Sequence, residues 1–164
     1  MHALAYFILV YIPALVANGS ATLVSSGHPL DLGRRLWDGR RILGDGKTFE
    51  GFTLGLLYST SVALSESIWV GDPQLLAYGV VAGFGALLGD IAGSFLKRRM
   101  GYERGARVPL LDQLDFLLGA YMATMMSGYR PPLLYAVVFA AMVYVLHRAT
   151  NMAAYKLGIK TVPW

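Results

Sequence analysis

The chain of 164 residues contains no cysteine and few charged residues. The absence of cysteine excludes a disulfide framework, a thiolate zinc site and a cysteine nucleophile. Charged residues make up 15% of the sequence and hydrophobic residues 55%, whereas soluble domains carry about 25% charged residues. This composition excludes disorder, which requires low hydrophobicity and high charge, and it argues against an ordinary soluble enzyme.

Long apolar runs separate the few clusters of charged residues. The runs without Lys, Arg, Asp or Glu are Met1–Leu30, Gly51–Ser65, Pro73–Gly89, Phe116–Tyr129 and Pro131–His147. A helix needs about 20 mostly apolar residues to cross a bilayer, and the shorter runs reach this length by including one or two charged residues at an end. We therefore expect an all-α integral membrane protein whose single domain spans residues 1–164, with five transmembrane helices near 3–24, 51–70, 74–98, 109–128 and 132–150.

A soluble core helix or a signal peptide would also produce an apolar run. A buried helix of a soluble protein accounts for any one run, but five such runs leave too few charged residues to cover a soluble surface. A cleaved signal peptide is the alternative for the first run, but Met1–Phe7 lacks the positive segment that such signals carry.

Basic residues are distributed unequally among the segments that connect the predicted helices. Only Arg130 lies after the fourth helix. The other 13 of the 14 lie after the first helix or at and beyond the ends of the third and fifth: Arg34, Arg35, Arg40, Arg41, Lys47, Lys97, Arg98, Arg99, Arg104, Arg107, Arg148, Lys156 and Lys160. The positive-inside rule makes that side cytoplasmic. We therefore expect a multi-pass protein of the cell membrane with its N-terminus outside, its C-terminus inside and its active site facing the cytoplasm. The basic excess then orients the protein in the membrane and can bind anionic headgroups or phosphates. It does not indicate binding of nucleic acid.

Three aspartates lie near the predicted cytoplasmic ends of the third and fourth helices. Asp90 follows a long charge-free run, and helical spacing places Ser94 and Lys97 on its face. An ionisable residue at such a depth usually faces a cavity, a partner or a site. Asp112 and Asp115 are three residues apart, so their carboxylates share one face of the fourth helix. Together the three carboxylates form a hard, all-oxygen site of the kind that suits Mg²⁺ with substrate phosphate oxygens.

The same polar residues also suit purely structural roles. Asp90 can be an interfacial residue that Lys97 or Arg98 neutralises, and the aspartate pair of the fourth helix suits the positive end of the helix dipole. Asn18, near the predicted cytoplasmic end of the first helix, either lines a polar cavity or belongs to a helix kink.

A glycine-rich segment precedes the second predicted helix. Residues 38–51 read DGRRILGDGKTFEG, but a Walker A motif requires glycine at the position of Arg41, so this motif is excluded. Glycines still expose backbone amides, and Lys47 and Thr48 add donors at a helix start, which makes a good anion site. The alternative is a flexible turn between two helices.

The motifs of these segments resemble those of a known enzyme family. Ser94–Arg98 (SFLKR) followed by Asp112–Asp115 (DQLD) is similar to the signature of membrane CDP-diacylglycerol synthases, Ser-x-apolar-Lys-Arg and later Asp-Arg-apolar-Asp. Together with Gly44–Thr48 (GDGKT) and the compact length, the pattern resembles the archaeal branch, the five-helix CDP-archaeol synthases.

The resemblance implies a reaction and roles for residues. CTP and an isoprenoid-glycerol ether lipid phosphate would give a CDP-archaeol-type lipid and pyrophosphate, with Mg²⁺, in membrane phospholipid biosynthesis. The implied catalytic residues are Asp90, Lys97, Asp112 and Asp115, and the three aspartates would hold the metal. Candidates for binding CTP or phosphate are Asn18, Arg40, Arg41, Gly44, Asp45, Gly46, Lys47, Thr48, Ser94 and Arg98.

Other membrane functions are alternatives to this hypothesis. A phosphatidate cytidylyltransferase would act on diacyl lipids instead. A CDP-alcohol phosphotransferase places its acidic residues four apart, whereas Asp112 and Asp115 are three apart. A small transporter or scaffold would use the charged segments as a solvated surface, although five helices do not divide into two equal inverted halves.

Overall fold

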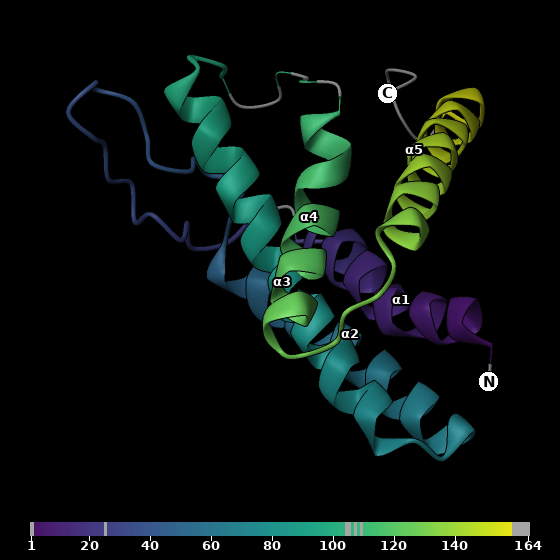
Figure 1. Ribbon diagram of the computed structural model, residues 1–164. Coiled ribbons are helices and arrows are strands. Elements are labelled where there is room, and N and C mark those ends of the chain that lie inside the picture. Colours follow the sequence, from purple (N-terminus) through teal and green to yellow (C-terminus); the bar gives the residue numbers. More distant parts are fainter. Residues whose placement is uncertain (1, 25, 104–105, 107, 109, 159–164) are drawn as a thin grey trace. The chain divides into compact units, whose positions relative to one another are not determined.

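The computed structural model describes residues 2–24, 26–103, 106, 108 and 110–158. In these segments the chain forms five helices, which are α1 (Ala3–Ala21), α2 (Phe49–Val70), α3 (Pro73–Arg99), α4 (Leu111–Met126) and α5 (Leu133–Lys156) (Figure 1). The same segments contain no strand beyond two isolated bridges in the connection before α2, so the all-α prediction is confirmed. Met1, Arg104, Arg107 and Lys160, which the sequence argument names, lie outside the described residues, as does residue 109 at the start of the predicted fourth helix.

The helices differ from the predicted boundaries at their ends. α1 ends at Ala21, before the predicted residue 24, because the chain turns at Thr22, whose amide and hydroxyl both donate to the Gly19 carbonyl. α5 continues to Lys156, beyond the predicted residue 150, since neither glycine nor proline interrupts it before Gly158.

Among the described residues, two helices are long and apolar enough to cross a bilayer by length and composition, Ala3–Ala21 and Pro73–Arg99, and Leu133–Leu146 is a shorter apolar stretch. Large apolar side chains also lie on the surface of α2, where Ile68 is 72% and Trp69 is 83% exposed. Contiguous apolar surface of this kind is unfavourable in water and natural against lipid.

The described chain divides into two compact units. The first ends at Arg130 and contains α1 to α4, and the second begins at Pro131 and contains α5. Every residue that the sequence nominates for catalysis or binding belongs to the first unit.

Glycines on α3 allow close packing against its neighbours. A Cβ placed at Gly83 would lie 2.5 Å from Ser59 Oγ of α2, and one at Gly85 would lie 2.5 Å from Ala123 Cβ of α4. Toward α4 the glycine recurs at every fourth position as far as Gly93. Small residues at such positions let helix backbones approach one another in membrane proteins.

The same close approaches show the direction of successive helices. Gly55 of α2 faces the Ala17 carbonyl of α1, and Gly51, one turn earlier, faces the Ala21 carbonyl, one turn later. α1 and α2 are therefore antiparallel, and the contacts of α3 with α2 and α4 follow the same rule. The C-termini of α1 and α3 and the N-termini of α2 and α4 thus lie at one end of the unit, which we call the charged end.

A buried hydrogen bond also connects α1 with α4 inside this unit. Tyr11 Oη lies 2.7 Å from Thr124 Oγ1, and both side chains are almost fully buried. Thr124 Oγ1 also lies 3.0 Å from the carbonyl of Ala120 in its own helix, so the pair is satisfied without water. Because a polar pair in an apolar interior is costly unless it is hydrogen-bonded, this contact fixes how α1 and α4 pack.

Candidate functional site

The connection between α1 and α2 folds around the buried carboxylate of Asp31. Arg41 donates to it from Nη2 at 2.7 Å and from Nε at 3.2 Å. Three backbone amides complete the shell at 2.9 to 3.1 Å, those of Gly33, Leu43 and Gly44. Burial by itself raises the pKa of Asp31, but the hydrogen bonds outweigh burial and hold the pKa well below its usual range. A charged Asp31 therefore organises this connection, residues 26–48, which we call the α1–α2 loop.

The α1–α2 loop is also held against the C-terminal end of α3 (Figure 1). Arg99, the last residue of α3, donates from Nη1 to Asp38 Oδ1 at 2.6 Å and from Nη2 to the Arg41 carbonyl at 2.5 Å. In return, Arg40 Nη1 donates to the Arg99 carbonyl at 3.0 Å. Charge-assisted contacts of this kind are stronger than neutral ones, so the loop has a fixed place beside α3.

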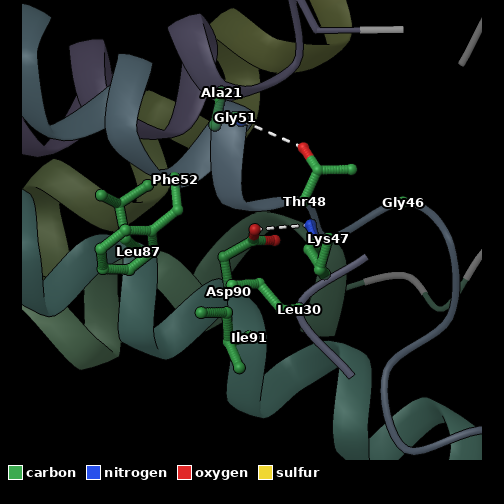
Figure 2. Close-up of a pocket in the computed structure, with 10 residues that line it drawn as sticks. All are labelled: Ala21, Leu30, Gly46, Lys47, Thr48, Gly51, Phe52, Leu87, Asp90 and Ile91. Carbon is green, nitrogen blue, oxygen red and sulfur yellow. Dashed lines mark hydrogen bonds and ion pairs between the residues drawn. The ribbon is translucent and has the colours of Figure 1, made fainter. Parts of the chain in front are cut away.

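The end of this loop presents Lys47 to α3. Thr48 caps α2, because its Oγ1 accepts from the Gly51 amide at 3.0 Å. The preceding Lys47 reaches across to α3, where its Nζ donates to Asp90 Oδ2 at 2.5 Å (Figure 2). Both residues line a small cavity with Gly46 and Thr48. The partner of Asp90 is thus Lys47, not Lys97 or Arg98.

A second lysine–aspartate pair joins α3 to α4. Lys97 Nζ donates to Asp112 Oδ1 at 2.8 Å, and Asp112 Oδ2 accepts from the Val108 amide at 3.0 Å. Asp90 and Lys97, which the sequence places on one face of α3, therefore contact different neighbours. Asp90 contacts the α1–α2 loop, and Lys97 contacts α4. Ser94, which lies between them in sequence, is buried.

The third aspartate lies against the backbone of α3. Asp115 is 9% exposed, and its Oδ1 accepts from the Phe116 amide at 2.7 Å. A Cβ at Gly93 would collide with Asp115 Oδ2, so the glycine leaves the space that this carboxylate occupies. Asp115 interacts electrostatically with Asp90 and with both lysines. We call these five side chains the lysine–aspartate cluster: Lys47, Asp90, Lys97, Asp112 and Asp115.

The chemistry of this cluster fits a divalent cation. Among the described residues, no three His, Asp or Glu side chains are already close enough to hold a metal ion. The donors are nevertheless hard oxygens of the kind that Mg²⁺ prefers, and Asp90 and Asp115 are near enough to repel each other. A cation between them would relieve that repulsion.

The predicted phosphate-binding residues have different surroundings. Several are engaged within the loop: Arg41 Nη1 pairs with Asp45 at 2.7 Å and its other donors meet Asp31, while the Gly44 amide also binds Asp31. Gly46 and Lys47 face the cavity instead. Arg40 lies at the surface. Arg98 has a buried Nε without a hydrogen-bond partner. Asn18 is half-buried in α1 and does not line the cavity.

Asp31 is a residue that organises the candidate site and that the sequence patterns do not indicate. Its only sequence signal is an isolated acid in a segment rich in arginine and glycine, ten residues before Arg41. A spacing of ten has no meaning in a helix or strand, so only the folded loop shows the pair.

An apolar groove extends from the cluster between α3 and α4. It has a volume of about 350 Å³ and is lined by Leu88, Gly89, Ala92, Gly93, Leu96, Leu111, Asp115, Leu118, Gly119 and Met122. Asp115 is the one acidic side chain in this lining. The groove therefore suits a ligand with an apolar chain whose polar head lies at the cluster.

Comparison with known proteins gives consistent matches. The family described as "CarS-like: CDP-archaeol synthase" matches residues 1–164. The CDP-archaeol synthase of Sulfolobus acidocaldarius is 50% identical over 157 residues, covering 96% of each chain. That of Hyperthermus butylicus is 51% identical over 158 residues, covering 96% of this chain and 94% of the relative. A solved structure described as an intramembrane enzyme for archaeal membrane lipids biosynthesis superposes with a TM-score of 0.84 at 43% identity, over 88% of this chain and 91% of the other.

Proposed function

The chain belongs to the CDP-archaeol synthase family, and we propose that its lysine–aspartate cluster is where CMP passes from CTP to an isoprenoid-glycerol ether lipid phosphate. One observation carries this assignment. Asp115 lines the apolar groove between α3 and α4 and also interacts electrostatically with Lys47 and Asp90 beside the glycine-rich loop. A lipid chain in the groove and a nucleotide at the loop would bring their phosphates together at this residue.

The reaction is a displacement at phosphorus. An oxygen of the lipid phosphate attacks the α-phosphorus of CTP, the bond from that phosphorus to the bridging oxygen breaks, and pyrophosphate leaves with the bonding electrons. The lipid phosphate is already anionic, so no general base is required. The protein must instead place the two phosphates in line and neutralise the charge on the leaving group.

Lys47 and Lys97 are suited to that neutralisation. Each is a compact positive charge on a flexible stem, Lys47 lines the cavity, and each lysine is paired with a carboxylate. Bound Mg²⁺ would neutralise further charge on the CTP phosphates, and Asp90, Asp112 and Asp115 are the residues that would hold it. With a cation bound to Asp90 and Asp112, their partners Lys47 and Lys97 would be available to phosphate oxygens. Each aspartate would then still face a positive charge, and each lysine a negative one.

We propose a membrane topology of five crossings in one membrane-embedded domain, with the charged end in the cytoplasm. The antiparallel order of α1 to α4 supports this arrangement, because it gathers the basic connections at one end of the unit. CTP is a cytoplasmic substrate, and a site at that end would be open to it. The apolar helices support a multi-pass arrangement, and the basic asymmetry of the connections supports its orientation.

The test is an assay with labelled CTP and a panel of lipid phosphates in nanodiscs. We expect CDP-lipid and pyrophosphate to form in equal amounts with the unsaturated isoprenoid ether lipid and in smaller amounts with diacyl phosphatidate. Preference for the diacyl lipid would make the chain a phosphatidate cytidylyltransferase. If no lipid gave product and CTP did not raise the unfolding temperature of the protein, the result would favour a non-enzymatic scaffold.

A further inference from the structure

The tip of the α1–α2 loop exposes apolar and basic side chains together. Leu32 is 63% and Trp37 is 89% exposed, and Arg34 and Arg35 between them are exposed as well. Arg35 Nη1 donates to the Gly39 carbonyl at 2.7 Å, which keeps this guanidinium at the tip. We call these four residues the Trp37 patch.

The backbone holds this patch in place. Leu32 has φ 49°, a left-handed conformation that a residue with a Cβ rarely adopts. The turn persists because the Leu32 amide donates to Pro29 O and the next amide, of Gly33, donates to the charged Asp31. Hydrogen bonds within the loop therefore hold the Leu32 side chain in its exposed position.

A second contact fixes the depth of the patch relative to the helices. Asp38, the neighbour of Trp37, accepts from Arg99 at 2.6 Å. Arg99 is the last residue of α3, one of the helices long and apolar enough to cross a bilayer. Trp37 therefore lies beside the basic last turn of α3, which follows the apolar part of the helix and suits the headgroup region of a bilayer.

We propose that the Trp37 patch inserts into the headgroup region of the bilayer that holds the protein. Tryptophan favours this region because its ring is apolar and its N–H is polar. Leu32 and Trp37 bury their side chains among the lipids, and Arg34 and Arg35 contact anionic headgroup phosphates. This contact fixes the α1–α2 loop over the membrane surface, independently of the proposed reaction.

Tryptophan fluorescence tests the insertion directly. The chain has three tryptophans, so the variant W69F/W164F retains Trp37 alone. In vesicles whose neutral or anionic lipids carry bromine near the top of the acyl chain, we expect quenching of Trp37 that is stronger with anionic lipid. The addition of R34Q and R35Q to this variant should reduce the quenching in anionic vesicles to that in neutral ones.

Matched controls make each outcome decisive. The variant W37F/W164F, which retains Trp69 on α2, reports whether the bilayer itself quenches as intended. Trp37 that is open to aqueous iodide and insensitive to brominated lipid would overturn the proposal. Quenching by CTP in vesicles without bromine, with no further quenching by brominated lipid, would overturn it in favour of stacking on the nucleobase. Trp37 emission that changes with protein density in the vesicle and not with bromine would overturn it in favour of contact between copies.

Discussion

Lys47 Nζ lies 2.5 Å from Asp90 Oδ2 and so connects the glycine-rich loop to α3, although 43 residues separate the two in sequence. Both side chains are mostly buried, at 24% and 19% exposed. An ion pair in such a place contributes little net stability against its desolvation cost. We propose that the pair serves function instead, because it would keep a lysine for phosphate and a carboxylate for a cation beside one cavity.

Lys47→Ala should weaken CTP binding more than lipid binding. Loss of one charge-assisted contact costs about 1.5–3 kcal/mol, so we expect the KM for CTP to rise roughly tenfold to a hundredfold. Initial rates measured over a range of CTP and of lipid would separate the two effects. Arg130→Ala is the control, since Arg130 is exposed and follows the end of α4 that lies away from the cluster, and it should leave the CTP dependence unchanged. An equal rise in both KM values would reduce Lys47 to a structural role.

Each of Asp90→Asn, Asp112→Asn and Asp115→Asn should lower turnover by at least about a hundredfold, or roughly 3 kcal/mol of transition-state stabilisation. The amide keeps the shape of the carboxylate and removes the charge that a hard cation needs. Binding of Mn²⁺, followed by its paramagnetic resonance, should weaken in parallel and gives a readout apart from activity.

Asp72→Asn is the control for these three variants. Asp72 caps α3 at the end away from the cluster, with Oδ1 accepting from the Gln74 amide at 2.9 Å. Asparagine caps helices equally well, so turnover should be unchanged. Normal turnover in all three cluster variants would remove the metal assignment and leave Asp90 and Asp112 as ion-pair partners of the lysines.

Asp31→Asn should destabilise the α1–α2 loop and change its response to acid. The pKa of Asp31 is lower in the folded state than in the unfolded chain, so its contribution is complete above about pH 4 and is lost as the pH falls toward the folded-state value. Hydrogen bonds to a charged group suggest a loss of about 1.5–3 kcal/mol at neutral pH. Thermal unfolding in detergent between neutral pH and pH 3 measures this, and the gap between wild type and variant should narrow below about pH 4.

Asp45→Asn is the matched control for Asp31→Asn. Asp45 also pairs with Arg41, but its side chain is 54% exposed. Exposed ion pairs contribute about 0–1 kcal/mol, so this variant should unfold within that range of wild type. If the two variants lost the same stability, the prediction that Asp31 stabilises the loop more than Asp45 does would be wrong.

The helices were predictable because length and hydrophobicity decide them locally. All five predicted ranges overlap a helix in the described residues, and the errors lie at ends such as Thr22, where a tight turn and not hydropathy stops α1. The residue types of the site were predictable for a similar reason, since charged residues near apolar runs are rare and conspicuous.

The partners of those residues could not be predicted. Asp90 meets Lys47 because of how the loop folds, whereas spacing along α3 offered Lys97. Arg41 was a candidate phosphate ligand, yet its donors meet Asp31 and Asp45. Such long-range pairs depend on tertiary structure, which periodicity within a helix does not describe.

Membrane topology can be tested with single cysteines, because the chain has none of its own. We expect Ser26→Cys and Met100→Cys, both exposed at the charged end, to be protected from an impermeant thiol reagent in intact cells. Gln74→Cys and Ser127→Cys, exposed at the opposite ends of α3 and α4, should be labelled. After permeabilisation all four should react. Labelling of the first pair in intact cells would invert the topology and place the site away from cytoplasmic CTP.

Gly93→Ala should disable the site while leaving the fold of α1 to α4 in place. The added Cβ would collide with Asp115 Oδ2, so the carboxylate must move, and a misplacement of about 1 Å can cost roughly a hundredfold in rate. Alanine favours a helix more than glycine by about 1 kcal/mol, which offsets part of the strain. We therefore expect a large fall in turnover with a small change in unfolding temperature. Gly19→Ala is the control, because a Cβ there meets nothing within 4 Å, and it should keep full activity. Normal turnover in Gly93→Ala would mean that the position of Asp115 against α3 has no part in catalysis.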